Sequence, residues 1–262
     1  MAIDVSQYLV AGKVALVTGG SRGIGEATAI ALAKAGADVA VTGRKLADLE
    51  RVAEQVRRTG RRALAVDAHI GRMELLQPLV DRVVKEFGRI DILVNNAGMG
   101  FAVPAIEMTE KAWDSVLNLD LKGLFFLSQI VAKIMKQQGG GRIINIASVD
   151  AYKVEVNLGH YSIAKAGVVM ATKVMALEWA PYHIRVNCIA PGAVETKLYD
   201  SHFIDLTPEE MKRRKDFAAQ RIPAGHIGQP SEIADVVLFL ASNAASYVTG
   251  ETILADGGSL LR

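Results

Sequence analysis

The sequence predicts an α/β fold: a doubly wound parallel sheet of about seven strands in a single domain spanning residues 1–262. Short apolar segments alternate with longer helical ones along the chain, and no linker interrupts the alternation. A glycine-rich turn directly follows the first apolar segment. Hydrophobic residues make up 50% of the chain, which is enough for a large core.

The predicted strands are runs rich in Val, Ile and Leu, as expected when both faces of a parallel sheet are covered. They lie near 13–18, 38–42, 62–66, 91–94, 142–146, 184–189 and 251–254. The predicted helices lie near 23–36, 45–59, 72–88, 110–137, 158–180 and 230–242. Ligands of such sheets bind beyond the carboxyl ends of the strands, so motifs that follow strands should converge on one edge. Segment 193–225 has no clear strand, and we expect it to form a mobile lid over that edge.

The first strand ends in a glycine-rich turn, and a segment of helical composition follows. This order of strand, turn and helix places a pyrophosphate at a helix N-terminus, where free N–H groups and the helix dipole favour an anion. The spacing Gly-x3-Gly-x-Gly differs from the more common Gly-x-Gly-x-x-Gly. The residues predicted to form this nucleotide site are Gly19, Ser21, Arg22, Gly23, Ile24 and Gly25.

A second motif lies in the helix predicted at 158–180. Tyr161 and Lys165 are four residues apart, so they share one helix face, one turn from each other. A nearby ammonium lowers a tyrosine pKa from its ordinary value of about 10 by roughly one to three units. Such a tyrosine can exchange a proton with an alcohol or ketone near neutral pH. Ser148, which follows the predicted fifth strand, is the candidate partner of Tyr161.

These two motifs, with four more in fixed order, resemble the classical short-chain dehydrogenase/reductase family over nearly the whole chain. The further motifs are Asn95-Asn96-Ala97-Gly98, Ile184-Arg185-Val186-Asn187, Pro191-Gly192 with Thr196, and Tyr247-Val248-Thr249-Gly250-Glu251 followed by Asp256-Gly257-Gly258. The resemblance implies a Rossmann-type domain and an oxidoreductase that interconverts a carbonyl and a secondary alcohol by hydride transfer. The alternative is a non-catalytic nucleotide-binding or scaffold protein of the same fold.

The resemblance also implies roles for individual residues. Tyr161 would be the catalytic acid/base, Ser148 would donate a hydrogen bond to the substrate oxygen, and Lys165 would hold the nicotinamide ribose. Asp120 stands where the family usually has an Asn that completes the catalytic set. The remaining cofactor contacts implied by the resemblance are Asp67, Asn95, Ala97, Gly98, Pro191, Gly192, Val194 and Thr196, together with Tyr161 and Lys165 themselves.

The choice of cofactor depends on the end of the second strand. Sites selective for NAD carry an acid there for the ribose 2′-OH, whereas NADP sites carry an arginine for the 2′-phosphate. This chain has Gly43 and Arg44 after the strand, and Arg22 adds a second cation. A guanidinium matches the geometry of a phosphate. The sequence therefore predicts NADP, with NAD as the alternative.

The substrate is predicted only as a small carbonyl or alcohol: an oxoacyl thioester, a polyol or keto-sugar, or a cyclic ketone. Segments 99–103 and 149–158 should form the pocket wall together with the lid residues Val194, Leu198, Tyr199 and Phe203. The basic run 212–215 attracts an acidic substrate on one interpretation, and on the other it is the solvated face of a lid helix.

Charge and composition narrow the remaining possibilities. The net charge of +2 argues against a nucleic-acid partner, and no apolar run is long enough for a membrane span. The single Cys188 lies in an apolar run and should be a buried thiol, which fits a cytoplasmic protein. The histidines lack metal-ligand spacing, so no metal site is expected. The resemblance implies a homotetramer or homodimer.

Overall fold

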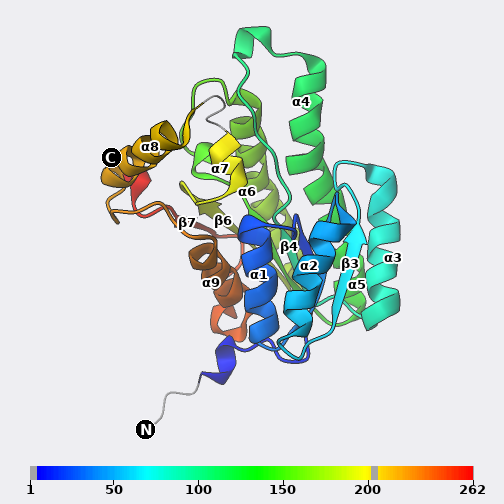
Figure 1. The fold of residues 1–262 in the computed structure, drawn as a ribbon. Helices are drawn as coiled ribbons and strands as arrows, with labels where there is room; N and C mark the ends of the chain where they lie inside the picture. Colours follow the sequence, from blue (N-terminus) through cyan, green and yellow to red (C-terminus); the bar gives the residue numbers. More distant parts are fainter. Residues whose placement is uncertain (1–4, 202–205, 262) are drawn as a thin grey trace.

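The computed structural model describes residues 5–201 and 206–261, and they form a parallel sheet in the order β3-β2-β1-β4-β5-β6-β7 with helices on both faces (Figure 1). The strands are β1 (Val14–Thr18), β2 (Asp38–Gly43), β3 (Ala63–Asp67), β4 (Ile92–Asn95), β5 (Gly141–Ile146), β6 (Ile184–Pro191) and β7 (Thr252–Ala255). Each lies within one or two residues of its expected place, so the predicted α/β fold is confirmed.

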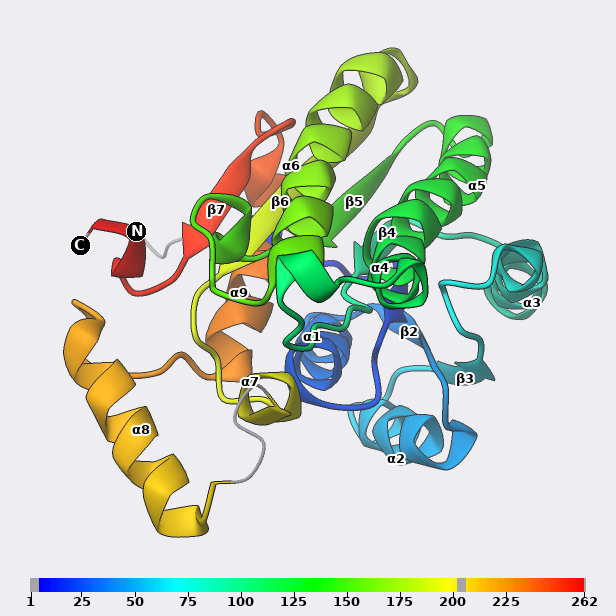
Figure 2. The ribbon, with the colours of Figure 1, turned by 90° about the horizontal axis from the view of Figure 1, so that it is seen from above.

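Two helical layers cover the sheet (Figure 2). One layer consists of α1 (Gly23–Lys34), α2 (Leu46–Arg57) and α9 (Pro230–Ala241). The other consists of α3 (Leu76–Phe87), α5 (Leu124–Gln137) and α6 (Gly159–Trp179), and α4 (Glu110–Leu117) precedes α5. The short α7 (Lys197–Ser201) and the longer α8 (Pro208–Arg221) lie at the carboxyl end of the sheet.

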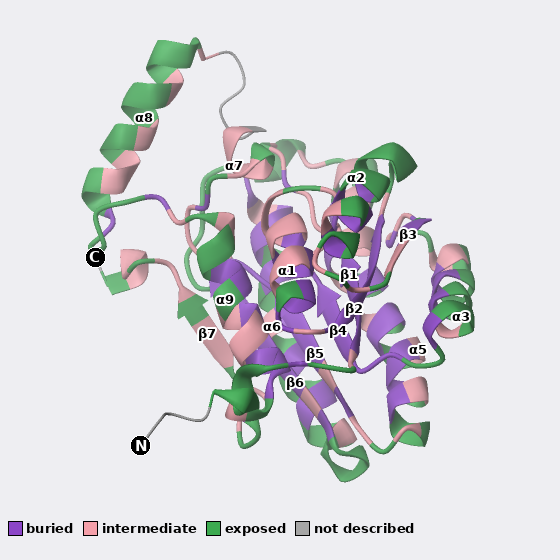
Figure 3. Ribbon diagram, turned by 60° about the horizontal axis from the view of Figure 1, so that its bottom comes forward, coloured by how far each residue is buried: buried purple, intermediate pink, exposed green. Residues whose placement is uncertain are grey.

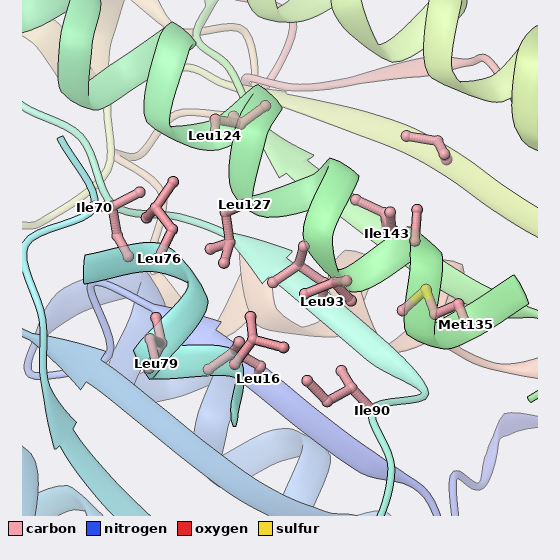
Figure 4. Close-up of a cluster of buried hydrophobic side chains, with 14 of the residues drawn as sticks. Leu16, Ile70, Leu76, Leu79, Ile90, Leu93, Leu124, Leu127, Met135 and Ile143 are labelled. Atoms are coloured by element: carbon pink, nitrogen blue, oxygen red, sulfur yellow. The ribbon is translucent and has the colours of Figure 1, made fainter. Parts of the chain in front are cut away.

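The hydrophobic core lies between the sheet and each layer. Strands β1 and β4 are buried at every residue, because helices cover both faces of the sheet (Figure 3). In one half of the core, Leu16 and Leu93 of the sheet pack with Leu76 and Leu79 of α3 and with Leu127 of α5 (Figure 4). The rigid sheet holds the turns at its carboxyl edge in fixed positions.

The helix expected at 110–137 is divided. A π-helical segment, Asn118–Gly123, separates α4 from α5 and turns Asp120 inward, where its side chain is fully buried. Gly123 packs so closely against the backbone of Ile70 that an added Cβ would collide with that carbonyl oxygen. The expected single helix at 110–137 is therefore wrong in this segment, where a π-helical turn interrupts it.

The lid expected at 193–225 contains two helices and not an irregular loop, and residues 202–205, with Phe203 of the expected pocket wall, lie outside the described part. Thr207, Pro208 and Glu210 form a capping box with Pro at the first helical position, which is a sequence signal for a helix start. Helix α8 has no buried residue and lies apart from the two layers, beyond α7 (Figure 2).

By length and composition alone, the helical region Glu110–Gln137 could cross a membrane. Its apolar character has another explanation, because α5 is a core helix whose Leu127 and Val131 are fully buried against the sheet. The predicted burial of Cys188 on β6 is confirmed, and burial raises the pKa of its thiol to about 11.

Candidate active site

The predicted site residues meet at the carboxyl edge of the sheet, where the strand order reverses between β1 and β4. A crevice at such a reversal is where ligands of open α/β sheets bind. Two cavities open there, of ≈ 350 Å³ and ≈ 1060 Å³. Ile24, Asn96, Gly98, Thr196 and Leu198 line both, so the two cavities are continuous.

The smaller cavity lies over the glycine turn. The predicted cofactor residues that line it are Gly19, Ser21, Arg22, Gly23, Ile24, Arg44, Ala97, Gly98 and Thr196. Gly19 and Gly23 have φ of +63° and +56°, which side chains other than glycine rarely adopt. Gly25 does not line the cavity, and an added Cβ there would collide with the carbonyl oxygen of Gly19. The turn is thus a cradle built of bare backbone, and its residues fit a dinucleotide pyrophosphate at the N-terminus of α1.

Two residues outside the predicted set join this turn to β4. Thr18 Oγ1 accepts hydrogen bonds from the N–H groups of Asn96 and Ala97, each at 3.0 Å. The side-chain amide nitrogen of Asn96, Nδ2, donates to the backbone carbonyl oxygens of Thr18 at 2.9 Å and of Gly19 at 3.2 Å. A hydroxyl residue at a strand end and a second Asn in the same motif were the signals that could have identified them.

Besides Gly25, two predicted cofactor residues, Asn95 and Asp67, line neither cavity. The Asn95 side chain is buried beneath the sheet edge and donates to Ser128 Oγ at 2.8 Å and to Asn145 Oδ1 at 2.9 Å. Asp67 is exposed at the end of β3. The structure therefore places Asn96, and not the Asn95 side chain, at the wall of the crevice.

The charged side chains that line the smaller cavity are basic. Arg44 and Arg22 line it together with His69, and no Asp or Glu stands among the described residues of its wall. Burial lowers the pKa of His69, and the positive charges of Arg44 and Arg72 act in the same direction. This wall suits a group with more negative charge than a ribose hydroxyl.

Three of the four predicted catalytic residues, Ser148, Tyr161 and Lys165, line the larger cavity together with Pro191, Gly192 and Val194, whereas Asp120 lines neither cavity. Tyr161 and Lys165 are buried on the same face of α6, with the lysine Nζ 5.4 Å from the centre of the tyrosine ring. Ser148 follows β5; its hydroxyl accepts from the Asp150 N–H at 3.1 Å and donates to the Asp150 carboxylate at 3.2 Å. The structure thus brings Ser148, Tyr161 and Lys165 together as the motif spacing predicted.

Asp120 forms a buried ion pair with Lys165. Its Oδ2 lies 3.1 Å from Lys165 Nζ, and its Oδ1 accepts from the Met99 N–H at 2.9 Å. The ammonium also donates to the Ile146 carbonyl oxygen at 3.0 Å. Gly98 packs directly beside the pair, where an added Cβ would lie 2.7 Å from the carboxylate.

The pKa directions of this group follow from burial and charge. Burial opposes the charge of Lys165, but the Asp120 carboxylate and Tyr161 attract the proton strongly enough to raise the pKa of Lys165. Burial also raises the pKa of Asp120, against the opposing effect of Lys165. The raised pKa of Lys165 favours a charged ammonium, whereas the raised pKa of Asp120 favours a neutral carboxyl group. We take both groups as charged, because the carboxylate lies within ion-pair distance of the ammonium and accepts the Met99 N–H.

The pKa of Tyr161 shifts against our expectation. Burial raises it above its ordinary value, and Asp120 and Asp150 act in the same direction. Lys165 and a hydrogen bond with Ser148 lower the pKa, but they do not offset burial. Lys165 therefore lowers the pKa of Tyr161 as predicted, but the prediction that this pKa lies below its ordinary value is wrong.

The outer wall of the larger cavity mixes apolar side chains with polar and charged ones. It includes Tyr199 of α7 and the α8 residues Arg214, Phe217 and Arg221, with Leu198 shared between the two cavities. The stretch after β5 contributes Asp150, Lys153, Glu155, Val156, Asn157 and Leu158. The basic run proves to be divided, because Arg214 lines the cavity whereas Lys215 forms an ion pair with Asp200 at 2.9 Å. Arg214 belongs to the basic run for which an acidic substrate was one of two interpretations, whereas Phe217 and Arg221 were not predicted from the sequence.

Among the described residues, no group of three His, Cys, Asp or Glu side chains could hold a metal ion.

Comparison with known proteins agrees with this arrangement. The family model described as enoyl-(acyl carrier protein) reductase matches residues 19–259. A 2-dehydro-3-deoxy-D-gluconate 5-dehydrogenase of Escherichia coli is 42% identical over 259 residues, covering 98% of this chain and 99% of the relative.

Two solved structures have nearly the same fold. A gluconate 5-dehydrogenase from Burkholderia cenocepacia, in complex with NADP and tartrate, is 33% identical with a TM-score of 0.90 and covers 98% of each chain. A 7α-hydroxysteroid dehydrogenase complexed with NADH and 7-oxo glycochenodeoxycholic acid is 35% identical with a TM-score of 0.91, again over 98% of each chain.

Proposed function

Because the chain belongs to the classical short-chain dehydrogenase/reductase family, we propose that it is an NADP(H)-dependent enzyme that interconverts a carbonyl and a secondary alcohol. The observation that carries the proposal is the convergence of Ser148, Tyr161 and Lys165 on one wall, continuous with the cavity over the glycine turn. A non-catalytic protein would have no need to keep a phenol, a hydroxyl and an ammonium together in a crevice.

Each side chain has a role that its surroundings support. A nicotinamide cofactor bound over the glycine turn would supply or accept the hydride. The Tyr161 hydroxyl gives its proton to the carbonyl oxygen during reduction and takes it back during oxidation. The Ser148 hydroxyl donates a hydrogen bond to the same oxygen, which stabilises the charge that develops there. Lys165, held by Asp120 and Ile146, binds the ribose of the cofactor.

The preference for NADP over NAD is supported by the basic wall of the smaller cavity. Arg44 follows β2 at the place where an acid would bind a ribose 2′-OH, and Arg22 lies in the adjacent turn. The relatives differ among themselves, since one structure contains NADP and another NADH.

For the substrate we propose a small hydroxylated carbonyl compound of the keto-sugar or sugar-acid type, ahead of the oxoacyl thioester and the cyclic ketone. The outer wall of the larger cavity carries Lys153, Arg214 and Asn157, which can bind hydroxyl and carboxylate groups. The names of the gluconate-type relatives support the same choice.

The decisive experiment is a panel of these three carbonyl classes assayed with NADPH and with NADH, followed by the loss of cofactor absorbance. We expect a keto-sugar or keto-acid to be reduced fastest, and with NADPH. A Ser148→Ala variant serves as the control and should lose turnover while binding NADPH. Reduction of none of the compounds, with NADPH still bound, would favour the non-catalytic alternative.

We further propose that the protein assembles as a homodimer or homotetramer in the cytoplasm. Helix α6 presents an exposed apolar stripe, Ile163, Met170, Val174 and Leu177, that recurs at helical spacing. A second copy of the chain can cover such a stripe by two-fold symmetry. Sedimentation of the wild type and of a Met170→Glu variant tests this proposal, and only the wild type should assemble.

A further inference from the structure

We propose that Asp120, by opposing the charge of Lys165, adds to the effect of burial in keeping Tyr161 protonated at neutral pH, so that carbonyl reduction proceeds there while alcohol oxidation needs alkaline conditions. The predicted effect on carbonyl reduction and alcohol oxidation rests on the proposed function. The effect of the ion pair on the pKa of Tyr161 can be measured without substrate.

The geometry makes the pair electrically neutral. The Asp120 carboxylate lies 3.1 Å from Lys165 Nζ, and the exposed fractions of the two side chains are 0% and 4%. With so little water nearby, charges act on each other strongly. The carboxylate therefore opposes the field of Lys165 at Tyr161, whose ring centre lies 5.4 Å from the same nitrogen.

An asparagine at position 120, the usual residue of the family, would act differently. Its amide has the same shape as the carboxylate but carries no charge, so the ammonium would stay uncompensated. An uncompensated cation favours the phenolate of a nearby tyrosine. The aspartate therefore opposes the lowering of the Tyr161 pKa for which the lysine is expected at this position.

The other groups that face Tyr161 do not reverse this effect. Asp150 adds a second negative charge from the segment after β5, and burial raises the pKa of the Tyr161 phenol. Ser148 lowers that pKa through a hydrogen bond. Burial also lowers the pKa of His160, the neighbour of Tyr161 on α6, which keeps its ring neutral. The charged groups on the outer wall of the cavity are Lys153, Glu155, Arg214 and Arg221.

The direct test is to titrate Tyr161 itself. The phenolate absorbance of each protein is measured against pH, and the curve of its Tyr161→Phe counterpart is subtracted, which isolates one of six tyrosines. We expect the midpoint to fall by about one to three pH units in the Asp120→Asn background. The matched control is Asp114→Asn, which removes an exposed carboxylate on α4 and should leave the midpoint unchanged.

The pH profile of kcat/KM gives a second readout that a merely structural role would not move. For Asp120→Asn, the acid limb of alcohol oxidation should move down by the same one to three units or so, with turnover at the optimum within about tenfold of wild type. Asp120→Leu should lose more, because the Met99 N–H loses its acceptor. If Asp120→Asn does not fold, Asp120→Ser removes the same charge with a smaller polar side chain.

The outcomes separate this inference from the proposed function. A midpoint that stays the same or rises in the charge-removing variant overturns the inference, whatever the enzyme reduces. A lowered midpoint in a protein that reduces no carbonyl supports the effect of Asp120 and rejects the proposed function. If only Asp120→Asn is active, Asp120 disables the site and both proposals fall.

Discussion

The two edges of the sheet carry the same kinds of charged side chain in different surroundings. At the amino edge, Asp38 pairs with Arg61 at 2.7 Å and with Arg62 at 2.8 Å, and the exposed fraction of the Arg62 side chain is 57%. At the carboxyl edge, Asp120 pairs with Lys165 at 3.1 Å with hardly any exposure.

This difference shows what each pair does. An ion pair that keeps its cation in water costs little to form and holds the ends of strands together. A fully buried pair carries a large desolvation cost, so it contributes little net stability. Burial, and not the type of charge, separates the structural edge from the chemical one.

The strongest way to sharpen this comparison is to remove the phenol at the carboxyl edge. Tyr161→Phe should lower kcat at least ~100-fold, because the proton transfer is lost, while NADPH binding and thermal stability remain. Steady-state kinetics and cofactor titration check this, with the exposed Tyr247→Phe as control. Near-normal turnover in Tyr161→Phe would rule out the mechanism.

A smaller effect is expected from the basic wall of the same edge. A charged hydrogen bond from Arg44 to a 2′-phosphate contributes roughly 1.5–3 kcal/mol, or about ten- to a hundredfold in affinity. Arg44→Asp should therefore shift the preference toward NADH, whereas Arg58→Asp, on the exposed end of α2, should not. Tighter binding of NADH than of NADPH by the wild type would contradict the assignment.

At the amino edge, we expect a substitution of Asp91 to lower the stability of the fold and to leave cofactor binding unchanged. The Asp91 carboxylate accepts the Val14 N–H at 3.0 Å and two hydrogen bonds from Arg89. Asp91→Ala leaves the buried N–H of β1 without a partner, which should lower the free energy of unfolding by about 1–3 kcal/mol. Denaturant unfolding measures this, and cofactor affinity should stay the same. If Asp91→Ala were as stable as wild type but no longer bound cofactor, the amino edge could not be called structural and the carboxyl edge chemical.

The smallest effect that we expect is a pH-dependent contribution of Asp38, at the same edge, to the stability of the fold. Burial opposes the charge of Asp38, but hydrogen bonds from Arg62 and the charge of Arg61 outweigh it and lower the pKa of the carboxyl. A lowered pKa in the folded state stabilises the protein above the unfolded value of about 3.9, and this contribution is lost as pH falls through the folded value. Asp38→Asn should therefore unfold at a lower temperature than wild type near neutral pH.

That difference should vanish in acid, since both proteins then carry a neutral side chain at position 38. Glu54→Gln, which removes an exposed pair on α2, serves as control and should match wild type throughout. A difference that persists unchanged at low pH would mean that Asp38 acts through packing and not through charge.

Much of the fold and of the chemical edge could be predicted from the sequence. The strands are continuous apolar runs, and the glycine turn, Ser148, Tyr161 and Lys165 have fixed spacings within single elements or at strand ends. The start of α8 also has a local signal, the capping box at Thr207, from which this helix could have been predicted.

Other features depend on contacts between distant segments. Asn95 and Asn96 are adjacent, yet one points into the buried network and the other lies at the crevice, because successive residues at a strand end face opposite sides. The π-helical turn that buries Asp120 comes from packing against the backbone at Ile70.

The sequence by itself determined the layered α/β fold, the edge at which the site forms and the residue types that act there, since these follow from local pattern and spacing. Only the tertiary structure decided that the pair of Asp120 with Lys165 is fully buried and that the pKa of Tyr161 rises. Charge interactions and desolvation depend on distance and on the exclusion of water, and both are set only when α4, α5 and α6 pack together on the sheet.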